Sequence, residues 1–453
     1  MGILFGTDGI RGVANTDLTC QLAYNVGRAG AHVLTKEINH APRILVAKDT
    51  RISGDMLEMS LAAGICSVGA HAVFAGIIPT PAVAHLVREY NLDAGIMISA
   101  SHNPVEYNGI KFFNSEGYKL KDSMESEIEE LLVKSLFDNA CEIPLPTGIQ
   151  IGTVSYKKNA MDDYVSYLKS AVVDSLKGMK IAVDCANGAS YKAAPNVFAG
   201  LGAEIFVKYA APDGTNINDN CGSTCMDEIK KLVLETGADA GFAFDGDADR
   251  CLCVDECGNE LDGDKILAVC GMNMKNKGVL NKDTIVGTVM SNLGLDIMTE
   301  KNGMNLVKTA VGDRYVLEEM LKNGYNLGGE QSGHIIFLDK NSTGDGILTA
   351  LNILAVMKDT GKKLSELGRL MQVMPQVLIN AKVNNVKKNT YMEYKEIRRA
   401  IRALENKYDT GGRILIRTSG TEPLVRVMIE GENIEEITKD AEDLAGLIEK
   451  ILE

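Results

Sequence analysis

Tryptophan is absent from the sequence, and aromatic residues make up only 5% of its 453 positions. Long apolar runs are absent too, since no stretch reaches the roughly 18 residues that a membrane-spanning helix needs. The first residues contain no basic segment followed by an apolar one, which a secretion signal would require. We therefore expect a protein that neither spans a membrane nor is secreted, and we predict a cytoplasmic location.

Basic residues are in the minority. The 47 Lys and Arg residues are outnumbered by 61 Asp and Glu residues, which leaves a net charge of −14 at pH 7. Nucleic acids and anionic membrane surfaces attract basic proteins, so we expect neither as a partner. If the substrate is an anion, a few local Arg and Lys side chains must overcome the repulsive field of the whole molecule.

The ten cysteines show no sign of a disulfide framework. Cys251, Cys253 and Cys270 lie within apolar, strand-like runs. Free buried thiols in a reducing compartment are therefore the favoured interpretation.

Short apolar runs alternate with segments of helical spacing. Residues 43–47 and 94–98 are such runs, and residues 57–68 between them have helical spacing. The alternation repeats within residues 180–244 and, more weakly, within residues 284–328. This pattern favours parallel sheets with helices on both faces.

In each repeat the last predicted strand leads into an unusual polar loop. These loops are residues 99–104, 245–250 and 329–334. Ligand sites of open α/β sheets lie beyond the carboxyl ends of the strands, so we expect the three loops to face one cleft.

The C-terminal residues follow a different pattern, with a charged helix predicted at 391–407, strands at 412–416 and 425–430, and a closing helix at 434–452. The predicted fold class is α/β, with three related mixed α/β domains plus a smaller C-terminal α+β domain around a central cleft. The predicted domains are residues 1–152, 153–253, 254–370 and 371–453, and the predicted linkers are residues 142–148 and 372–377.

The strongest local signal is the acidic loop Asp245-Gly-Asp247-Ala-Asp249-Arg250. Three carboxylates separated by small residues can converge on one hard cation, and without a cation they would repel one another. A calcium loop of the EF-hand type is disfavoured, because its sixth position must be Gly and is Arg250 here. A magnesium site is therefore predicted, with Arg250 placed to meet a phosphate beside the metal.

Four further segments and Lys111 carry reactive or anion-binding side chains, and each also has a purely structural interpretation. Ser101, beside His102, is either a nucleophile or phosphate carrier, or part of an ordinary turn, which is the favoured interpretation of the pair taken alone. Lys111 is a site residue or a surface lysine. The other three segments suit phosphate or sugar hydroxyls, or are simple turns and loops; they are Phe5–Gly12 with Arg11, Gly328–His334, and Arg417–Pro423 with Arg426 on the next strand.

Taken together, these segments resemble the motifs of the α-D-phosphohexomutase superfamily. The resemblance covers essentially the whole chain in the right order, and it includes Val311–Val316 as a sixth motif. It implies four domains around a central cleft, which carry in turn the phosphoserine loop, the metal-binding loop, the sugar-binding loop and a phosphate-binding site. Two departures, Ala248 where many relatives have Gly and Thr418 where many have Pro, remove no ligand.

The resemblance implies a role for each matching residue. Ser101 would carry the phosphoryl group, and Asp245, Asp247 and Asp249 would bind one Mg²⁺ together with a Ser101 phosphate oxygen. Arg250 would neighbour the phosphoserine, and Arg11, Lys111 and His334 would handle protons and charge. The implied sugar-binding residues are Gly312, Asp313, Arg314, Tyr315, Glu330 and Ser332. The implied anchor for the distal phosphate is Arg417, Ser419, Gly420, Thr421 and Arg426.

The resemblance also implies the reaction, which is most similar to that of members acting on glucosamine phosphates. Glucosamine 6-phosphate and glucosamine 1-phosphate would interconvert through glucosamine 1,6-bisphosphate, feeding UDP-N-acetylglucosamine synthesis. The same chemistry on glucose or mannose phosphates is the alternative, and a silent sugar-phosphate-binding protein and a phosphatase are rivals of other classes. A homodimer is compatible with the resemblance.

Overall fold

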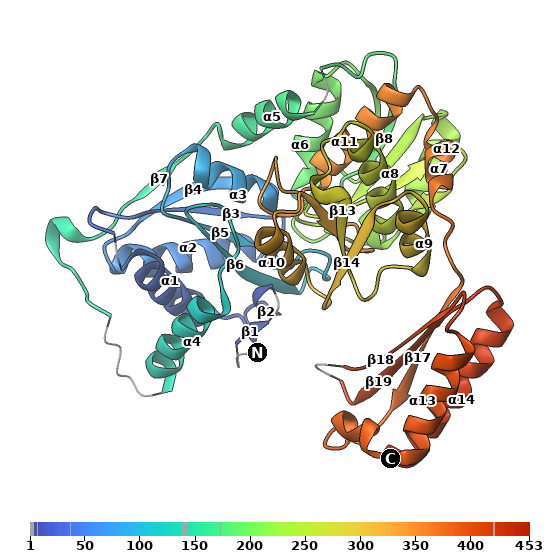
Figure 1. Cartoon of the computed structure of the whole chain (residues 1–453). Coiled ribbons are helices and arrows are strands. Elements are labelled where there is room, and N and C mark those ends of the chain that lie inside the picture. Colours follow the sequence, from blue (N-terminus) through green and yellow to red (C-terminus); the bar gives the residue numbers. More distant parts are fainter. Residues whose placement is uncertain (1–3, 7, 37, 138–142, 173, 420–421) are drawn as a thin grey trace.

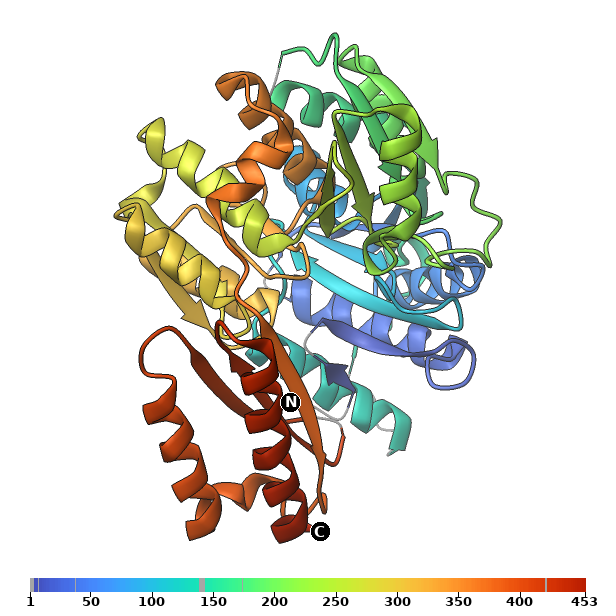
Figure 2. The same ribbon diagram turned by 90° about the vertical axis from the view of Figure 1, so that its right-hand side faces the viewer.

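The computed structural model describes residues 4–6, 8–36, 38–137, 143–172, 174–419 and 422–453. Three α/β units lie together, and a smaller C-terminal lobe is attached to them through one connection (Figures 1 and 2). Each unit contains its own sheet, and the predicted fold class is confirmed. None of the helices in the described part of the chain has the length and apolar character that crossing a membrane requires.

The first unit is a seven-stranded sheet in the order β1-β2-β6-β5-β3-β4-β7. Its strands are β1 (Phe5–Gly6), β2 (Gly9–Val13), β3 (Arg43–Lys48), β4 (His71–Ile77), β5 (Ala94–Ile98), β6 (Tyr107–Asn114) and β7 (Val154–Tyr156). Its helices are α1 (Cys20–Thr35), α2 (Gly54–Ser67), α3 (Thr80–Glu89) and α4 (Asp122–Phe137). Helices α1 and α2 pack closely because Gly64 lets their backbones approach; a Cβ there would lie 2.1 Å from the Tyr24 carbonyl oxygen.

The second unit is a five-stranded sheet in the order β12-β11-β10-β8-β9. Its strands are β8 (Lys180–Asp184), β9 (Glu204–Lys208), β10 (Ala240–Phe244), β11 (Cys251–Asp255) and β12 (Glu260–Leu261). Its helices are α5 (Ala160–Ala171), α6 (Ser190–Gly200) and α7 (Asp227–Thr236).

The third unit is a four-stranded sheet in the order β14-β13-β15-β16. Its strands are β13 (Thr284–Thr288), β14 (Asn305–Thr309), β15 (Leu327–Gly329) and β16 (Ile335–Phe337). Its helices are α8 (Gly263–Asn276), α9 (Leu293–Lys301), α10 (Asp313–Asn323), α11 (Gly346–Thr360) and α12 (Leu364–Leu367).

The C-terminal lobe is a three-stranded antiparallel sheet in the order β17-β19-β18. Its strands are β17 (Gln376–Lys382), β18 (Arg413–Thr418) and β19 (Leu424–Glu430), and its helices are α13 (Lys395–Lys407) and α14 (Ile434–Leu452). Short 3₁₀ helices complete the chain at Gly148–Gln150, Gly222–Thr224, Asn281–Asp283, Gly368–Leu370 and Lys388–Glu393.

The three α/β units share a local design. In each unit a buried strand (β5, β10 or β15) is followed by a polar loop. After the loop the chain forms a second strand (β6, β11 or β16), which pairs antiparallel with the first. The three polar loops are therefore equivalent in the three sheets, as the sequence pattern predicts.

Sheet membership differs from the predicted boundaries in two places. Strand β7 lies within the residues predicted for the second domain, but it is hydrogen bonded to β4 of the first sheet. The predicted boundary between residues 253 and 254 falls inside β11, and β12 extends the second sheet to Leu261. We therefore propose boundaries near residues 157 and 262. Strand β17 was not predicted, because its first two residues lie within the predicted linker 372–377.

The hydrophobic core separates a three-unit body from the C-terminal lobe. One buried cluster includes Phe113, Phe242 and Leu351 and so runs through all three α/β units. The lobe has a core of its own, formed by residues between Ala381 and Leu452. A shared core holds the first three units together, whereas the lobe is joined to them mainly through polar contacts described below.

Candidate active site

A cleft of about 640 Å³ lies where the polar loops meet. The first unit lines it with residues of β1, β2 and the Ser101 loop, and the C-terminal lobe contributes Arg417. The lining residues are Leu4, Phe5, Gly6, Asp8, Gly9, Arg11, His102, Asp249, Arg250, Val311, Gly312, Asp313, Glu330, His334 and Arg417. All four parts of the chain therefore reach one cavity.

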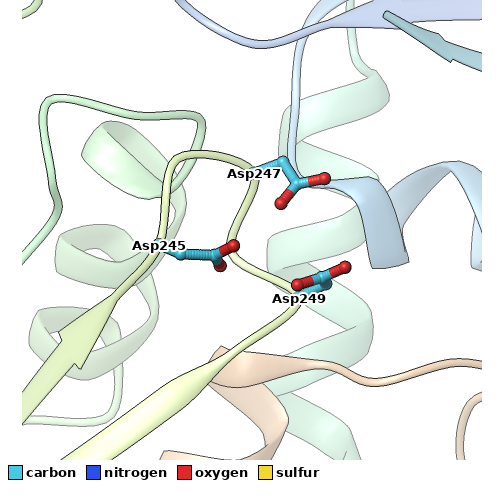
Figure 3. Close-up of side chains that lie close together, drawn as sticks. All are labelled: Asp245, Asp247 and Asp249. Carbon is cyan, nitrogen blue, oxygen red and sulfur yellow. The ribbon is translucent and has the colours of Figure 1, made fainter. Parts of the chain in front are cut away.

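Ser101 and the acidic loop lie in direct contact. The Ser101 hydroxyl donates a hydrogen bond to Asp245 Oδ2 at 2.5 Å, and both side chains are buried. Carboxylate oxygens of Asp245, Asp247 and Asp249 all lie within 4.8 Å of one another, and the three side chains point toward a common centre (Figure 3). The β10–β11 loop turns tightly enough for this because Ala248, at φ 58°, adopts a left-handed conformation.

This arrangement fits a divalent cation. Asp247 Oδ1 and Asp249 Oδ1 are buried and have no hydrogen-bond partner among the described residues. Burial, followed by the neighbouring charges of Asp249 and Asp247, raises the pKa of Asp245 well above its ordinary value. A cation bound between the carboxylates would remove this repulsion, and an all-oxygen donor set suits Mg²⁺.

Two cations flank the acidic loop. Lys111 Nζ is 2.8 Å from Asp247 Oδ2 and 2.8 Å from Asp8 Oδ2. Although burial opposes its charge, the carboxylates of Asp247 and Asp8 raise the pKa of Lys111, which keeps it protonated. The backbone N–H of Arg250 donates to Asp245 Oδ1 at 3.1 Å, and its side chain lines the cleft.

His334 contacts both the acidic loop and the third unit. Its Nδ1 is 3.6 Å from Asp249 Oδ2, and its Nε2 is 3.3 Å from Asp313 Oδ2. Burial opposes protonation, but Asp313 and Asp249 outweigh it and raise the pKa of the ring above 6.5. Lys119, which the sequence analysis missed, bridges Asp313 and Asp8 at 2.5 Å each. Alternating charges therefore connect the three α/β units around the cleft.

The predicted sugar-binding residues divide into two groups. Glu330, Gly312 and Asp313 line the cleft, and Glu330 Oε1 accepts a hydrogen bond from the Gly312 N–H at 3.0 Å. The structure does not bring the other three predicted residues to the cleft wall. Arg314 is instead paired with Glu125 and Asp122 of α4, while Tyr315 and Ser332 are exposed.

The predicted phosphate anchor lies in the C-terminal lobe. Arg417 and Arg426 are directly opposite each other on β18 and β19, and the Nε of each is buried without a partner among the described residues. Burial, together with the charge of Arg426, lowers the pKa of Arg417. Ser419 is buried beside them, whereas Gly420 and Thr421 lie outside the described residues. Two opposed cations repel unless an anion lies between them.

A second set of residues supports the Ser101 loop and was missed by the sequence analysis. Asp49 and Arg51 follow β3, and Asn218 comes from the second unit. Arg51 and Asn218 both donate to the Ser101 carbonyl oxygen at 2.9 Å. Their one sequence signal is that Asp49-Thr-Arg51 follows the carboxyl end of a strand, where ligand sites of α/β sheets gather.

Four family models cover most of the chain. They describe the phosphoglucomutase/phosphomannomutase domains: α/β/α domain I at residues 2–138, domain II at 162–258, domain III at 262–374 and the C-terminal domain at 378–447. The chain belongs to this family. The resemblance to the α-D-phosphohexomutase superfamily is thereby confirmed.

Relatives with curated names are similar over their full length. The phosphoglucosamine mutase of Acetivibrio thermocellus is 59% identical over 452 residues, which cover 100% of both chains. The phosphoglucosamine mutase of Clostridium perfringens strain SM101 is 60% identical over 449 residues, or 99% of both chains. At this similarity the chain is an enzyme of the family.

Solved structures show the same fold. A phosphoglucomutase/phosphomannomutase family protein from Burkholderia thailandensis has a TM-score of 0.79 at 23% identity, with 97% of each chain covered. The N-acetylphosphoglucosamine mutase of Aspergillus fumigatus, in complex with GlcNAc-6P and magnesium, has a TM-score of 0.68 at 19% identity, covering 100% of this chain and 96% of the other.

Proposed function

We propose that this enzyme interconverts glucosamine 6-phosphate and glucosamine 1-phosphate through a phosphoryl group carried by Ser101. The observation that carries the proposal is the 2.5 Å contact between the Ser101 hydroxyl and Asp245, inside a cluster of three carboxylates at the edge of a cleft. A serine held there can accept and return a phosphoryl group, whose transfer depends on positioning and charge neutralisation. The full-length relatives named phosphoglucosamine mutase support the choice of sugar.

The position of each residue in the site indicates its proposed role. Asp245, Asp247 and Asp249 would hold Mg²⁺, which when bound neutralises charge on the phosphoryl oxygens. Arg250 extends this neutralisation into the cleft, where it borders the space open to a sugar phosphate. Lys111 is buried behind the carboxylates and protonated, so we assign it a charge role, whereas His334 and Arg11 line the cleft and are placed to handle the proton and charge of the sugar hydroxyl.

The reaction requires the substrate to bind in two directions. A sugar hydroxyl attacks the phosphoryl group on Ser101 and loses its proton, the bond between phosphorus and Ser101 Oγ breaks, Oγ takes up a proton, and glucosamine 1,6-bisphosphate forms. The bisphosphate then turns, so that its other phosphate faces Ser101 and is returned. In either direction the phosphate remote from Ser101 can lie between Arg417 and Arg426, because guanidinium groups bind phosphate whichever sugar carbon carries it. Ser419, Gly420 and Thr421 complete this proposed anchor.

The proposed sugar contacts come from the third unit. Glu330 lines the cleft beside Gly312 and Asp313, and its two carboxylate oxygens can accept hydrogen bonds from sugar hydroxyl groups. Burial raises the pKa of Glu330, and the charge of His334 opposes this. When ionised, its carboxylate can pair with a cation in the cleft. A protonated sugar amine is such a cation, which favours glucosamine over glucose or mannose. Arg314, Tyr315 and Ser332 could meet the sugar only after a rearrangement of the cleft.

The test is turnover of three sugar phosphates by the magnesium-loaded enzyme in the presence of a trace of the matching bisphosphate. We expect the highest kcat/KM with glucosamine phosphate; equal or better use of glucose or mannose phosphate would reject the choice of sugar. Ser101→Ala should abolish turnover but retain binding of glucosamine 6-phosphate. Release of inorganic phosphate in step with substrate loss would instead indicate a phosphatase.

Cytoplasmic location and a homodimer stay predictions from the sequence. So does the supply of glucosamine 1-phosphate to UDP-N-acetylglucosamine synthesis.

A further inference from the structure

Arg51 uses every N–H donor of its side chain in hydrogen bonds to the Ser101 loop and to neighbouring groups. Its guanidinium group is fully buried. Nε donates to Asp49 Oδ2 at 2.9 Å, and the two terminal nitrogens donate to four backbone carbonyl oxygens between residues 101 and 107. These belong to Ser101 at 2.9 Å, Asn103 at 2.7 Å, Pro104 and Tyr107 at 3.0 Å. A guanidinium group has five N–H donors, and all five are engaged.

A second chain of hydrogen bonds reaches the same loop from Asp49. Its Oδ2 accepts from the Ser99 hydroxyl at 2.6 Å, and the Ser99 oxygen accepts from the Ser101 N–H at 2.9 Å. Asn218 adds bonds to the carbonyl oxygens of Ser101 and Asn103 at 2.9 and 3.1 Å. Both backbone groups of Ser101 are therefore held by buried side chains.

Ser101 needs this support because its backbone is in the left-handed region, at φ 52°. Such a conformation is costly for a residue with a side chain and persists only where its surroundings impose it. It is this conformation that presents the hydroxyl to Asp245.

We infer that Arg51 is a positioning residue for phosphoryl transfer, acting through the Ser101 loop. The inference rests on the proposed function. Because all its donors are used by Asp49 and the loop, Arg51 has none left for a phosphate or a sugar. Its role is to keep Ser101 Oγ at the carboxylate cluster for both transfers of each catalytic cycle. A lysine offers three donors from one nitrogen and cannot hold four carbonyl groups and a carboxylate.

The test compares Arg51→Lys with wild-type enzyme on whichever sugar phosphate the wild type turns over best. Misplacing a reacting group by about 1 Å can cost about 100-fold in rate, so we expect kcat to fall about 100-fold. KM should stay within about threefold, because the cleft lining and the phosphate anchor are unchanged. Hydrogen exchange at residues 99–107 of the full-length protein should become faster, and this measurement needs no substrate.

The matched control is Arg88→Lys. Arg88 also joins two units, by donating to Asn341 Oδ1 at 3.0 Å, but it lies away from the Ser101 loop. We expect unchanged kcat and unchanged exchange at residues 99–107. Should Arg51→Lys fail to fold, Ser99→Ala is the second variant. It removes only the hydrogen bonds that connect Asp49 to the Ser101 N–H, and it should also lower kcat.

Unchanged kcat and exchange in Arg51→Lys, or a loss equal to that of Arg88→Lys, would overturn the role of Arg51. Failure of the wild type to interconvert any hexose phosphate would instead refute the proposed function. The two failures are therefore distinguishable.

Discussion

At the scale of single residues, the site is built from buried charges whose carboxylates are only partly hydrogen bonded. Asp247 and Asp249 each leave one carboxylate oxygen without a hydrogen-bond partner among the described residues. Burying such groups destabilises the folded state, so this cost must be offset by other interactions in the fold or by a bound ligand. A cation bound at this position would therefore contribute to stability as well as to chemistry.

We predict that Mg²⁺ raises the thermal unfolding midpoint of metal-free enzyme by several degrees. A ligand at 100 times its Kd stabilises the folded state by about 2.7 kcal/mol. Asp249→Asn should lose most of this response and most activity, because one charged ligand is removed. Asp174→Asn, at an exposed aspartate, should respond like the wild type. A midpoint of the wild type that does not respond to Mg²⁺ would contradict the metal site.

A second residue-scale prediction concerns Asp264, near the junction with the C-terminal lobe. Burial, followed by the charge of Asp262, raises the pKa of Asp264 to about 7. The folded protein therefore binds this proton more tightly than the unfolded chain, so protonation stabilises the fold at low pH. That stabilisation is lost as the pH rises toward and through 7, at about 1.4 kcal/mol per pKa unit, or up to about 4 kcal/mol.

Asp264→Asn should remove this dependence, because the amide stays neutral and its oxygen can still accept from the Asn292 N–H. We expect the variant to be more stable than the wild type at pH 8 and similar to it at pH 4.5, measured by denaturant unfolding. The same difference at both pH values would refute the assignment.

At the scale of elements, the β18–β19 pair contains two arginines of like charge that face each other. Cross-strand neighbours of like charge destabilise a sheet, yet Arg417 and Arg426 are directly opposite each other. Glu422 balances only one of them, through an ion pair with Arg426 at 2.9 Å. The conflict is resolved if a phosphate group lies between the two arginines.

We therefore predict that Arg417→Gln raises KM for the sugar phosphate about 10- to 100-fold. A charge-assisted hydrogen bond contributes about 1.5–3 kcal/mol, which corresponds to this range. The variant should also lose the stabilisation that inorganic phosphate gives the wild type in thermal unfolding. The control is Arg399→Gln on the exposed part of α13. Equal KM values for both variants would show that β18 does not bind the substrate.

At the scale of the whole molecule, the enzyme is a three-unit body with a separately packed lobe. At the junction, Arg413 pairs with Glu430 and donates to the Ser291 carbonyl oxygen at 2.8 Å. Asn292 exchanges two hydrogen bonds with the Met374 backbone at 2.9 and 3.0 Å. We expect the lobe to rotate about residues 371–375, which would move Arg417 relative to the rest of the cleft lining.

We predict that Asn292→Ala loosens the lobe without unfolding it. The substitution removes both bonds to Met374 and the cap that Asn292 gives α9, at a cost of about 1–3 kcal/mol. Limited proteolysis near residues 371–375 should become faster, and saturating sugar phosphate should slow it again. Asn302→Ala at the other end of α9 is the control. Cleavage at the wild-type rate would show that Asn292 does not restrain the lobe.

The sequence by itself determined the strands that are buried on both faces and the loops that follow them. The predicted run 94–98 coincides with β5, because a strand buried on both faces is mostly apolar. The repeats predicted within residues 180–244 and 284–328 contain β10 and β13. The same reasoning singled out the acidic loop, because three carboxylates at the carboxyl end of such a strand have few structural uses. Ser101 taken alone favoured an ordinary turn, and its role was assigned through the family resemblance.

Only the tertiary structure decided which side chains meet. It placed β7 in the first sheet, turned Arg314 toward α4, and brought Lys119 and Arg51 into the network around the cleft. Lys119 and Asp313 are 194 positions apart, and nothing in the local pattern of either segment records that they touch. Apolar periodicity reports whether a residue is buried, whereas the partner of a buried charge depends on how whole units pack together.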